Sequence, residues 1–396
     1  MNTKEFTERY YVDRRGTWCY KWDSPEEQGK DHVISMSVAD MDFKVPEAVT
    51  EAMIRRVEHG AFGYTITPDP YLEAFITWEK ERHQVEIEKE WIRFSPGIVT
   101  GIYWCIQAYT QPGEAVIINT PVYYPFHEAI LDLKRKLVRS ELVPAEGRYT
   151  VDFEDFERKI VDEDVKMFIL CSPHNPVGRV WEEKELEQLF DICGRHGVMI
   201  IADEIHQDFV YSGHTHISSL NVEDGKYKDN VILMASASKT FNLAGLKNSF
   251  VVIPSEEKRK VFDAYEVSPH VDTACLMSYV AVEAAYRYGA DWLGDLLKVI
   301  WENYEYAKNT FEKELPESII TPLEGTYLFW VDLGAYVSAD EIVDLVQEKA
   351  QVVPDFGNVF SDKCGTFIRL NLATSMENVE KAVNAVIKQI RERGLK

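Results

Sequence analysis

The chain has 396 residues, of which 45% are hydrophobic, so it is long and apolar enough for two domains around a sizeable core. Its 43 basic and 66 acidic residues give a formal net charge of −23, which argues against nucleic acid or an anionic membrane surface as the main partner. No signal peptide or membrane-spanning run is evident. The six cysteines are widely spread without a Cys-x-x-Cys pair, which predicts free thiols and a cytoplasmic location.

The elements predicted for the first two thirds of the chain alternate between helices and short apolar strands. Residues 1–45 are expected to form an arm that joins a smaller domain or a partner subunit, and 46–59 a helix closed by Gly60. Strands are predicted at 115–118, 166–171, 198–202 and 230–235, with a helix over 182–195. Continuous apolar strands separated by helices are typical of an α/β fold with a mostly parallel sheet covered on both faces.

The last part of the chain has a different pattern, typical of a smaller α+β domain. Helical patterns dominate from 273 to 314. A strand over 327–331, a helix from 339, a short strand near 352, a strand over 366–370 and a closing helix from 376 follow. We place the junction near residue 285, which gives a large domain over 46–285 and a small domain over 286–396.

Lys239 is the first candidate for chemistry. It lies in the segment SASKTFNLAG (residues 236–245), directly after a predicted buried strand and among hydroxyl side chains. Burial at such a position favours the neutral amine, which is the nucleophilic form. A Schiff base with an aldehyde cofactor whose phosphate needs hydroxyl donors would suit these residues, and pyridoxal 5′-phosphate (PLP) is such a cofactor. The alternative is a solvated lysine in a Ser/Thr loop.

Two polar residues stand at the ends of other predicted strands. Asp203 ends the strand at 198–202, where a carboxylate is costly unless it is paired, and a protonated pyridine nitrogen would be a suitable partner. A helix cap or a salt-bridged acid is the alternative. Asn175 lies in the turn SPHNPVG (residues 172–178) and could donate a hydrogen bond to the phenolate oxygen of such a cofactor. By itself, Asn-Pro is only a turn signal.

Other candidates are a helix start, an aromatic side chain and an arginine. GIVTG (residues 97–101) begins a predicted helix, where free backbone amides can bind phosphate. Tyr123 could stack on a cofactor ring or belong to the core. Arg369 lies in an apolar strand, where a substrate carboxylate or an internal acid would satisfy it.

Several other functions find no support in the motifs. There is no Gly-x-Gly-x-x-Gly, Gly-x-x-x-x-Gly-Lys, His-Glu-x-x-His or Gly-x-Ser-x-Gly sequence, which weakens nicotinamide, P-loop, zinc-protease and α/β-hydrolase readings. His206, His214 and His216 are close in sequence, but nothing else in their spacing favours a metal site.

Taken together, these residues resemble the fold-type I PLP enzymes of the class I/II aminotransferase family over almost the whole chain. One branch, the MalY/PatB-type cystathionine β-lyases, is indicated by VADMDF (38–43), FGY (62–64), TPVYYPF (120–126), PHNP (173–176), DEIH (203–206) and SKTFN (238–242). This resemblance implies cleavage of the C–S bond of L-cystathionine or similar L-cysteine S-conjugates to a thiol, pyruvate and ammonia. An amino-acid aminotransferase is the alternative activity, and a PLP-binding protein that acts through a partner is a third hypothesis.

The resemblance also implies a role for each candidate residue. Lys239 would hold the cofactor and remove the Cα proton, Asp203 would pair with the pyridine nitrogen, and Asn175 would bond the ring oxygen. His206 would lie near that oxygen, and Tyr123 would stack on the ring. The cofactor phosphate would be held by Val99, Thr100, Ser236, Ser238 and Lys247. Tyr64 would reach the phosphate of the neighbouring subunit of a homodimer, while Arg369, Ala39 and Tyr123 would contact the substrate.

Three positions depart from the family's usual residues. Ser37 replaces a tryptophan that helps to wall the substrate pocket, so substrate preference is open at this position. Lys247 stands where arginine is common, and it can neutralise phosphate only as a point charge. Ser361 replaces a glycine in the small-domain loop that follows Phe360.

Overall fold

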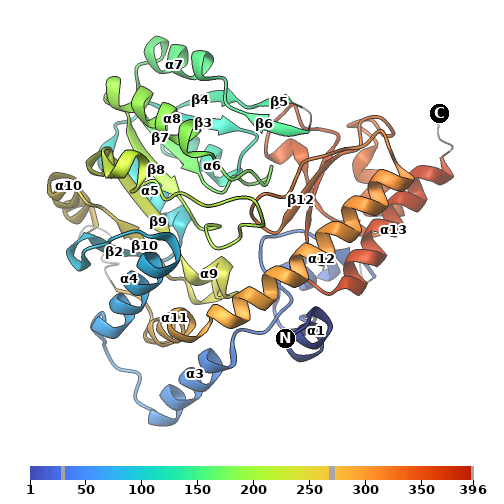
Figure 1. The fold of residues 1–396 in the computed structure, drawn as a ribbon, viewed down its shortest axis with the longest axis horizontal. Coiled ribbons are helices and arrows are strands. Elements are labelled where there is room, and N and C mark those ends of the chain that lie inside the picture. The colour runs from blue at the N-terminus through green and yellow to red at the C-terminus, as the bar shows by residue number, and fades with distance from the viewer. Residues whose placement is uncertain (28–31, 146, 267–272, 394–396) are drawn as a thin grey trace.

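A seven-stranded sheet organises the larger part of the protein, whose computed structural model describes residues 1–27, 32–145, 147–266 and 273–393 (Figure 1). In spatial order its strands are β2 (Ile92–Ser95), β10 (Ser249–Val252), β9 (Val231–Ala235), β8 (Met199–Asp203), β7 (Val165–Cys171), β3 (Ala115–Thr120) and β4 (Lys136–Glu141). The neighbours from β9 to β4 run parallel, whereas β10 is antiparallel to both β2 and β9. The predicted mostly parallel α/β sheet is therefore confirmed.

The sheet is covered on both faces, so its central strands β3, β8 and β9 are buried along their whole length even where they carry polar residues such as Asn119 and Asp203. Successive side chains point to opposite faces of the sheet and join different hydrophobic clusters: Ile117 packs in one cluster, and Val116 and Ile118 pack in the other. On one face lie α5 (Ile98–Tyr109), α6 (Pro125–Asp132) and α10 (Glu256–Glu266). On the other face lie α4 (Asp69–His83), α7 (Phe153–Asp162), α8 (Glu183–Arg195) and α11 (Leu276–Tyr288).

The C-terminal part forms a second layer of helices and strands. Its antiparallel sheet has the order β11 (Ile319–Ile320), β12 (Leu328–Asp332), β15 (Phe367–Asn371) and β14 (Asp355–Phe356). The long helix α12 (Ala290–Glu314) runs from the large sheet's side to this part and packs along α13 (Met376–Glu392) (Figure 1). The expected junction near residue 285 falls within α11, just before α12 begins.

The N-terminal segment joins the C-terminal part. Helix α1 (Thr3–Tyr10) packs on α12, with the rings of Phe6 and Trp292 5.7 Å apart, and it is followed by α2 (Tyr20–Glu27). Strand β1 (Ile34–Ser35) then pairs in parallel with β13 (Val352–Val353). Of the two attachments expected for the arm, contact with the C-terminal part of the chain is therefore present.

The remaining elements include one departure from the sequence prediction. Helix α3 (Glu47–His59) ends at Gly60, whose φ of 75° is the left-handed conformation that favours glycine. The other elements are the hairpin of β5 (Val143–Ala145) and β6 (Arg148–Thr150) and the short helix α9 (Ala237–Thr240). Instead of an α-helix from residue 339, a π-helix spans Asp344–Lys349, with the Ala350 amide bonded to the Leu345 carbonyl. The apolar pattern of the sequence cannot distinguish an α-helix from a π-helix here, since either helix would bury Leu345 and Val346.

Within the described residues, no helix has the length and apolar character that spanning a membrane requires.

Candidate active site

A cavity of about 420 Å³ opens at the carboxyl ends of β7, β8 and β9. Parallel α/β sheets bind ligands at this edge, because loops and helix N-termini gather there. The cavity brings together most of the residues that the sequence singled out. It is lined by Ala39, Val99, Thr100, Tyr123, Asn175, Asp203, His206, Ser238, Lys239 and Lys247, among others.

Lys239 lies in α9, directly after β9, and its amine points to the edge of this cavity. Its Nζ donates a hydrogen bond of 2.5 Å to the carbonyl of Ala39. Burial lowers the pKa of Lys239 from 10.5 to about 8, although nearby acids act in the opposite direction. About a tenth of the amine is therefore neutral at pH 7, far more than for an ordinary lysine, as a nucleophilic or basic lysine requires.

Asp203 is the last residue of β8, and it is buried at the floor of the cavity. Its Oδ1 accepts a hydrogen bond of 3.1 Å from the Ile205 amide. Burial raises the pKa of this carboxyl to about 7. Among the described residues no basic side chain forms an ion pair with Asp203, so the salt-bridged alternative is not found. With a pKa of about 7 the carboxyl is only partly ionised at neutral pH, and a cationic partner from outside the protein would stabilise its carboxylate form.

Arg369 and Asn175 meet on the side of the cavity nearest the small domain. Arg369 is 2% exposed, and its Nη1 donates to Oδ1 of Asn175 at 2.8 Å. That bond orients the Asn175 amide so that its Nδ2 is the group left to donate to a ligand. The second Nη of Arg369 donates to Asp355 Oδ2 at 2.5 Å, so an internal acid does pair with this arginine, while its buried Nε has no hydrogen-bond partner among the described residues.

A second cavity of about 320 Å³ adjoins the first and shares Ala39, Tyr123 and Lys239 with it. Ser37, Asp355 and Arg369 line this second cavity. A small molecule bound here would touch the Lys239 amine and the Arg369 guanidinium together. This is the arrangement that an α-amino acid needs if its carboxylate is held while its Cα faces a base.

Another part of the lining of the first cavity is suited to a phosphate group. Val99 and Thr100 lie in the first turn of α5, after Gly97, and the first backbone amides of a helix have no intrahelical partners. Ser238 and Lys247 line the same cavity. Ser236 does not line the cavity. Its Oγ donates to the Asn248 carbonyl at 2.7 Å and accepts from the Ser238 amide at 3.1 Å, so it supports Ser238 from behind.

The two predicted ring contacts differ in exposure and charge. Tyr123 is half-buried, and burial raises its pKa, which keeps the hydroxyl neutral. His206 is buried, and burial together with the cations Lys239 and Arg369 holds its pKa well below the usual range, so the imidazole is neutral.

The neighbouring histidines do not form a metal site in the part of the chain that the structure describes. His216 bonds to Glu204 at 2.9 Å. Over the described ranges, no three His, Cys, Asp or Glu side chains are arranged to hold a metal ion.

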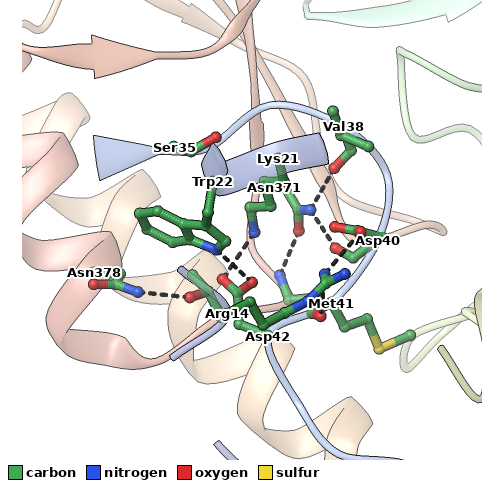
Figure 2. Close-up of polar contacts among 12 residues, drawn as sticks. Arg14, Lys21, Trp22, Ser35, Val38, Asp40, Met41, Asp42, Asn371 and Asn378 are labelled. Atoms are coloured by element: carbon green, nitrogen blue, oxygen red, sulfur yellow. Dashed lines mark hydrogen bonds and ion pairs between the residues drawn. The ribbon is translucent and has the colours of Figure 1, made fainter. Parts of the chain in front are cut away.

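A loop from the N-terminal segment carries Ala39, and a buried polar network fixes its position (Figure 2). Asn371 Nδ2 donates to the carbonyls of Val38 and Asp40, at 2.6 Å each, and Arg14 pairs with Asp40 at 2.7 Å. Val38 adopts a φ of 56°, which is unusual for a β-branched residue and is strained. The loop held in this way presents the Ala39 carbonyl, which accepts hydrogen bonds from Lys239 and from the Tyr327 hydroxyl, the latter at 2.9 Å.

Two contributors to the site had not been singled out from the sequence. Tyr327 begins a strand-like apolar run, and Asp355 follows Pro354 in a short segment without a motif. Neither residue lies in a sequence motif that indicates a role in the site, because each reaches the site only through packing between segments that are far apart in the chain. Tyr64, by contrast, lies outside the cavity and is fully exposed between α3 and α4.

The residues present fit PLP. A buried carboxylate without a protein cation matches a protonated pyridine nitrogen, and free helix amides with Ser238 and Lys247 match a phosphate. An amine of lowered pKa, that of Lys239, lines the same cavity. The donor set therefore corresponds to one molecule that carries an aldehyde, a ring nitrogen and a phosphate.

Comparison with known proteins supports the same conclusion. The aminotransferase class I and II family model matches residues 31–386. The cystathionine β-lyase PatB of Bacillus subtilis is 36% identical, covering 94% of this chain and 97% of its own length, and protein MalY of Escherichia coli is 31% identical, covering 96% and 97%. The PLP-bound C–S lyase from Staphylococcus hominis superposes with a TM-score of 0.90 at 33% identity, covering 96% of this chain and 97% of that one.

Proposed function

Because the chain belongs to the aminotransferase class I and II family, we propose that it is a PLP-dependent carbon–sulfur β-lyase. Its substrates are L-cystathionine or related L-cysteine S-conjugates, and its products are a thiol, pyruvate and ammonia. The observation that carries the proposal is the placement of Lys239 between the Asp203 carboxylate and the Arg369 guanidinium. Similarity over nearly the full length to a cystathionine β-lyase favours elimination over amino transfer.

When bound, PLP supplies an electron sink for the charge that develops at the substrate Cα. Asp203 would keep the ring nitrogen protonated, because its carboxylate has no ion-pair partner among the described residues. The Asn175 amide would donate to the ring oxygen, while Tyr123 would cover the ring. The Val99 and Thr100 amides, Ser238 and Lys247 would hold the phosphate.

Lys239 performs the proton transfer. Its amine has a pKa of about 8 because of burial, so near neutral pH it can accept the Cα proton as a general base. The Ala39 carbonyl, 2.5 Å away, holds the amine in place. Arg369 binds the α-carboxylate and thereby aims the Cα–H bond towards Lys239. Departure of the thiolate from Cβ then competes with return of the proton.

The oligomeric state and location belong to the same proposal. Tyr64 is fully exposed, and its neighbours Phe62 and Ile66 are 59% and 81% exposed. An apolar strip of this kind favours burial against a second copy, which would bring Tyr64 to the partner's phosphate site. Six free cysteines are consistent with the reducing cytoplasm.

The test is a reaction of purified protein with PLP and L-cystathionine in the absence of any keto acid. We expect pyruvate and free thiol at equal rates, and neither from Lys239→Ala under the same conditions. Amino transfer that requires a keto acid, without release of thiol, would establish the aminotransferase instead. Sedimentation of the same sample reports whether the protein is a dimer, and a Tyr64→Phe variant tests the hydroxyl without removing the ring.

A further inference from the structure

The carboxylate-binding arginine of the site already has a carboxylate partner within the chain. Asp355 and Arg369 face each other across the antiparallel strands β14 and β15. Asp355 Oδ2 accepts from Arg369 at 2.5 Å and from the Val38 amide at 3.1 Å. Strand register therefore builds the pair into the fold, and it does not depend on a flexible surface contact.

This pair sets the charge balance of the substrate cavity. Among the described residues that line the cavity, Asp355 is the only acid, and Lys239 and Arg369 are the only bases. In the proposed function Lys239 is committed to the cofactor and to proton transfer. The single remaining positive charge, on Arg369, is then matched by Asp355 before any substrate enters.

A substrate α-carboxylate must therefore displace or share the Asp355 contact, and because the substrate α-amino group is committed to the cofactor, two carboxylates then face one guanidinium, which leaves one negative charge in excess around Arg369. The Asp355 side chain is 20% exposed and that of Arg369 is 2% exposed, so water screens this excess charge poorly. The cavity holds only about 320 Å³ and Asp355 lines it, so a side chain bound there shares a small space with this carboxylate. A cationic group on the substrate restores the balance, whereas a second anionic group worsens it.

We propose that Asp355 is a specificity residue that selects L-cysteine S-conjugates bearing a cationic group beyond the sulfur and rejects those bearing only an anionic one there. The inference rests on the proposed function and names its substrate class. Asp355 acts through its charge on the substrate, and takes no part in proton transfer.

Binding of amino acids that cannot undergo β-elimination tests the charge preference directly. L-Lysine, L-norleucine and L-2-aminoadipate have side chains of similar length that end in a cation, a methyl group and an anion, and none has a sulfur to lose. Titration calorimetry on the PLP-loaded protein should give affinity in that order, with steps of about tenfold, the effect expected of a nearby unit charge. Asp355→Asn preserves an acceptor for the Val38 amide and should reduce each step to about twofold or less.

Asp362→Asn is the matched control, since it removes the same charge from an exposed position that does not line the cavity. This variant should retain the full order. The idea is overturned if the unchanged protein binds the three amino acids equally or not at all, or if Asp355→Asn retains the full order.

A second measurement uses pyruvate release from S-(2-aminoethyl)-, S-propyl- and S-carboxymethyl-L-cysteine. The kcat/KM values should fall in that order and converge in Asp355→Asn. If no thioether yields pyruvate while the calorimetric order holds and depends on Asp355, the proposed lyase activity fails and the charge selection stands. If pyruvate is released with no dependence on Asp355, the lyase stands and the charge selection fails.

Discussion

Replacement of Lys21 by methionine should loosen the loop that positions the catalytic lysine. Lys21 Nζ bonds Asp42 Oδ2 at 2.9 Å, and both side chains are at most 1% exposed (Figure 2). Methionine keeps most of the volume but leaves the Asp42 carboxylate with the Trp22 indole, 2.8 Å away, as its only side-chain donor among the described residues. Breaking a buried pair by removing one partner costs about 3–5 kcal/mol.

That cost converts into a measurable opening of the segment. At about 1.4 kcal/mol per decade, it raises the population of the open state by two to nearly four orders of magnitude. The Asp42 amide bonds the Ala373 carbonyl at 3.0 Å, so its hydrogen exchange reports this opening. Exchange of residues 37–42, followed by mass spectrometry, should accelerate accordingly, and kcat/KM should fall because Ala39 no longer holds Lys239 firmly.

Two further variants separate this explanation from a general loss of stability. Lys21→Met combined with Asp42→Asn removes both charges, and it should recover most of the protection. Lys4→Met removes a lysine that is 85% exposed and pairs with Glu8 at 3.8 Å, and it should change nothing measurable. Unchanged exchange in Lys21→Met, or a double variant as open as the single one, would refute the reasoning.

Three other outcomes are expected. Lys239→Ala should abolish turnover and the visible absorbance of the bound cofactor while the circular dichroism spectrum stays native; normal turnover would contradict the whole mechanism. Because burial raises the pKa of Asp203 from 3.8 to about 7, the folded cofactor-free protein retains a proton that the unfolded chain releases, and stability falls as the pH rises between these values. Asp203→Asn should therefore melt higher than the unchanged cofactor-free protein at pH 8 and equally at about pH 4, and the same difference at both pH values would count against this assignment. Ser37→Trp should change the ratio of kcat/KM for L-cystathionine to kcat/KM for S-methyl-L-cysteine at least tenfold, because Ser37 lines the substrate cavity; an equal change for both substrates would place the effect elsewhere.

Much of the fold was predictable because its signals are local. Continuous apolar runs identified the central strands to within one or two residues, and glycine after residue 59 marked a helix end. Polar residues directly after such strands, Lys239 and Asp203 above all, had to meet at one edge of a parallel sheet. The π-helix at Asp344–Lys349 was not predictable, since its burial pattern is that of an ordinary helix.

By itself the sequence determined the sheet, the strand-end residues and, through its motifs, the family and cofactor. Only the tertiary structure decided what those residues contact. The Ala39 carbonyl meets Lys239 from 200 positions away in the chain, and Asn175 meets Arg369 from 194. The cross-strand register sets Asp355 against Arg369, and Ser236 turns its hydroxyl to Asn248. Such contacts depend on how separate elements pack against one another. Local periodicity specifies which face of a helix or strand is buried, but it does not specify which other element that face packs against.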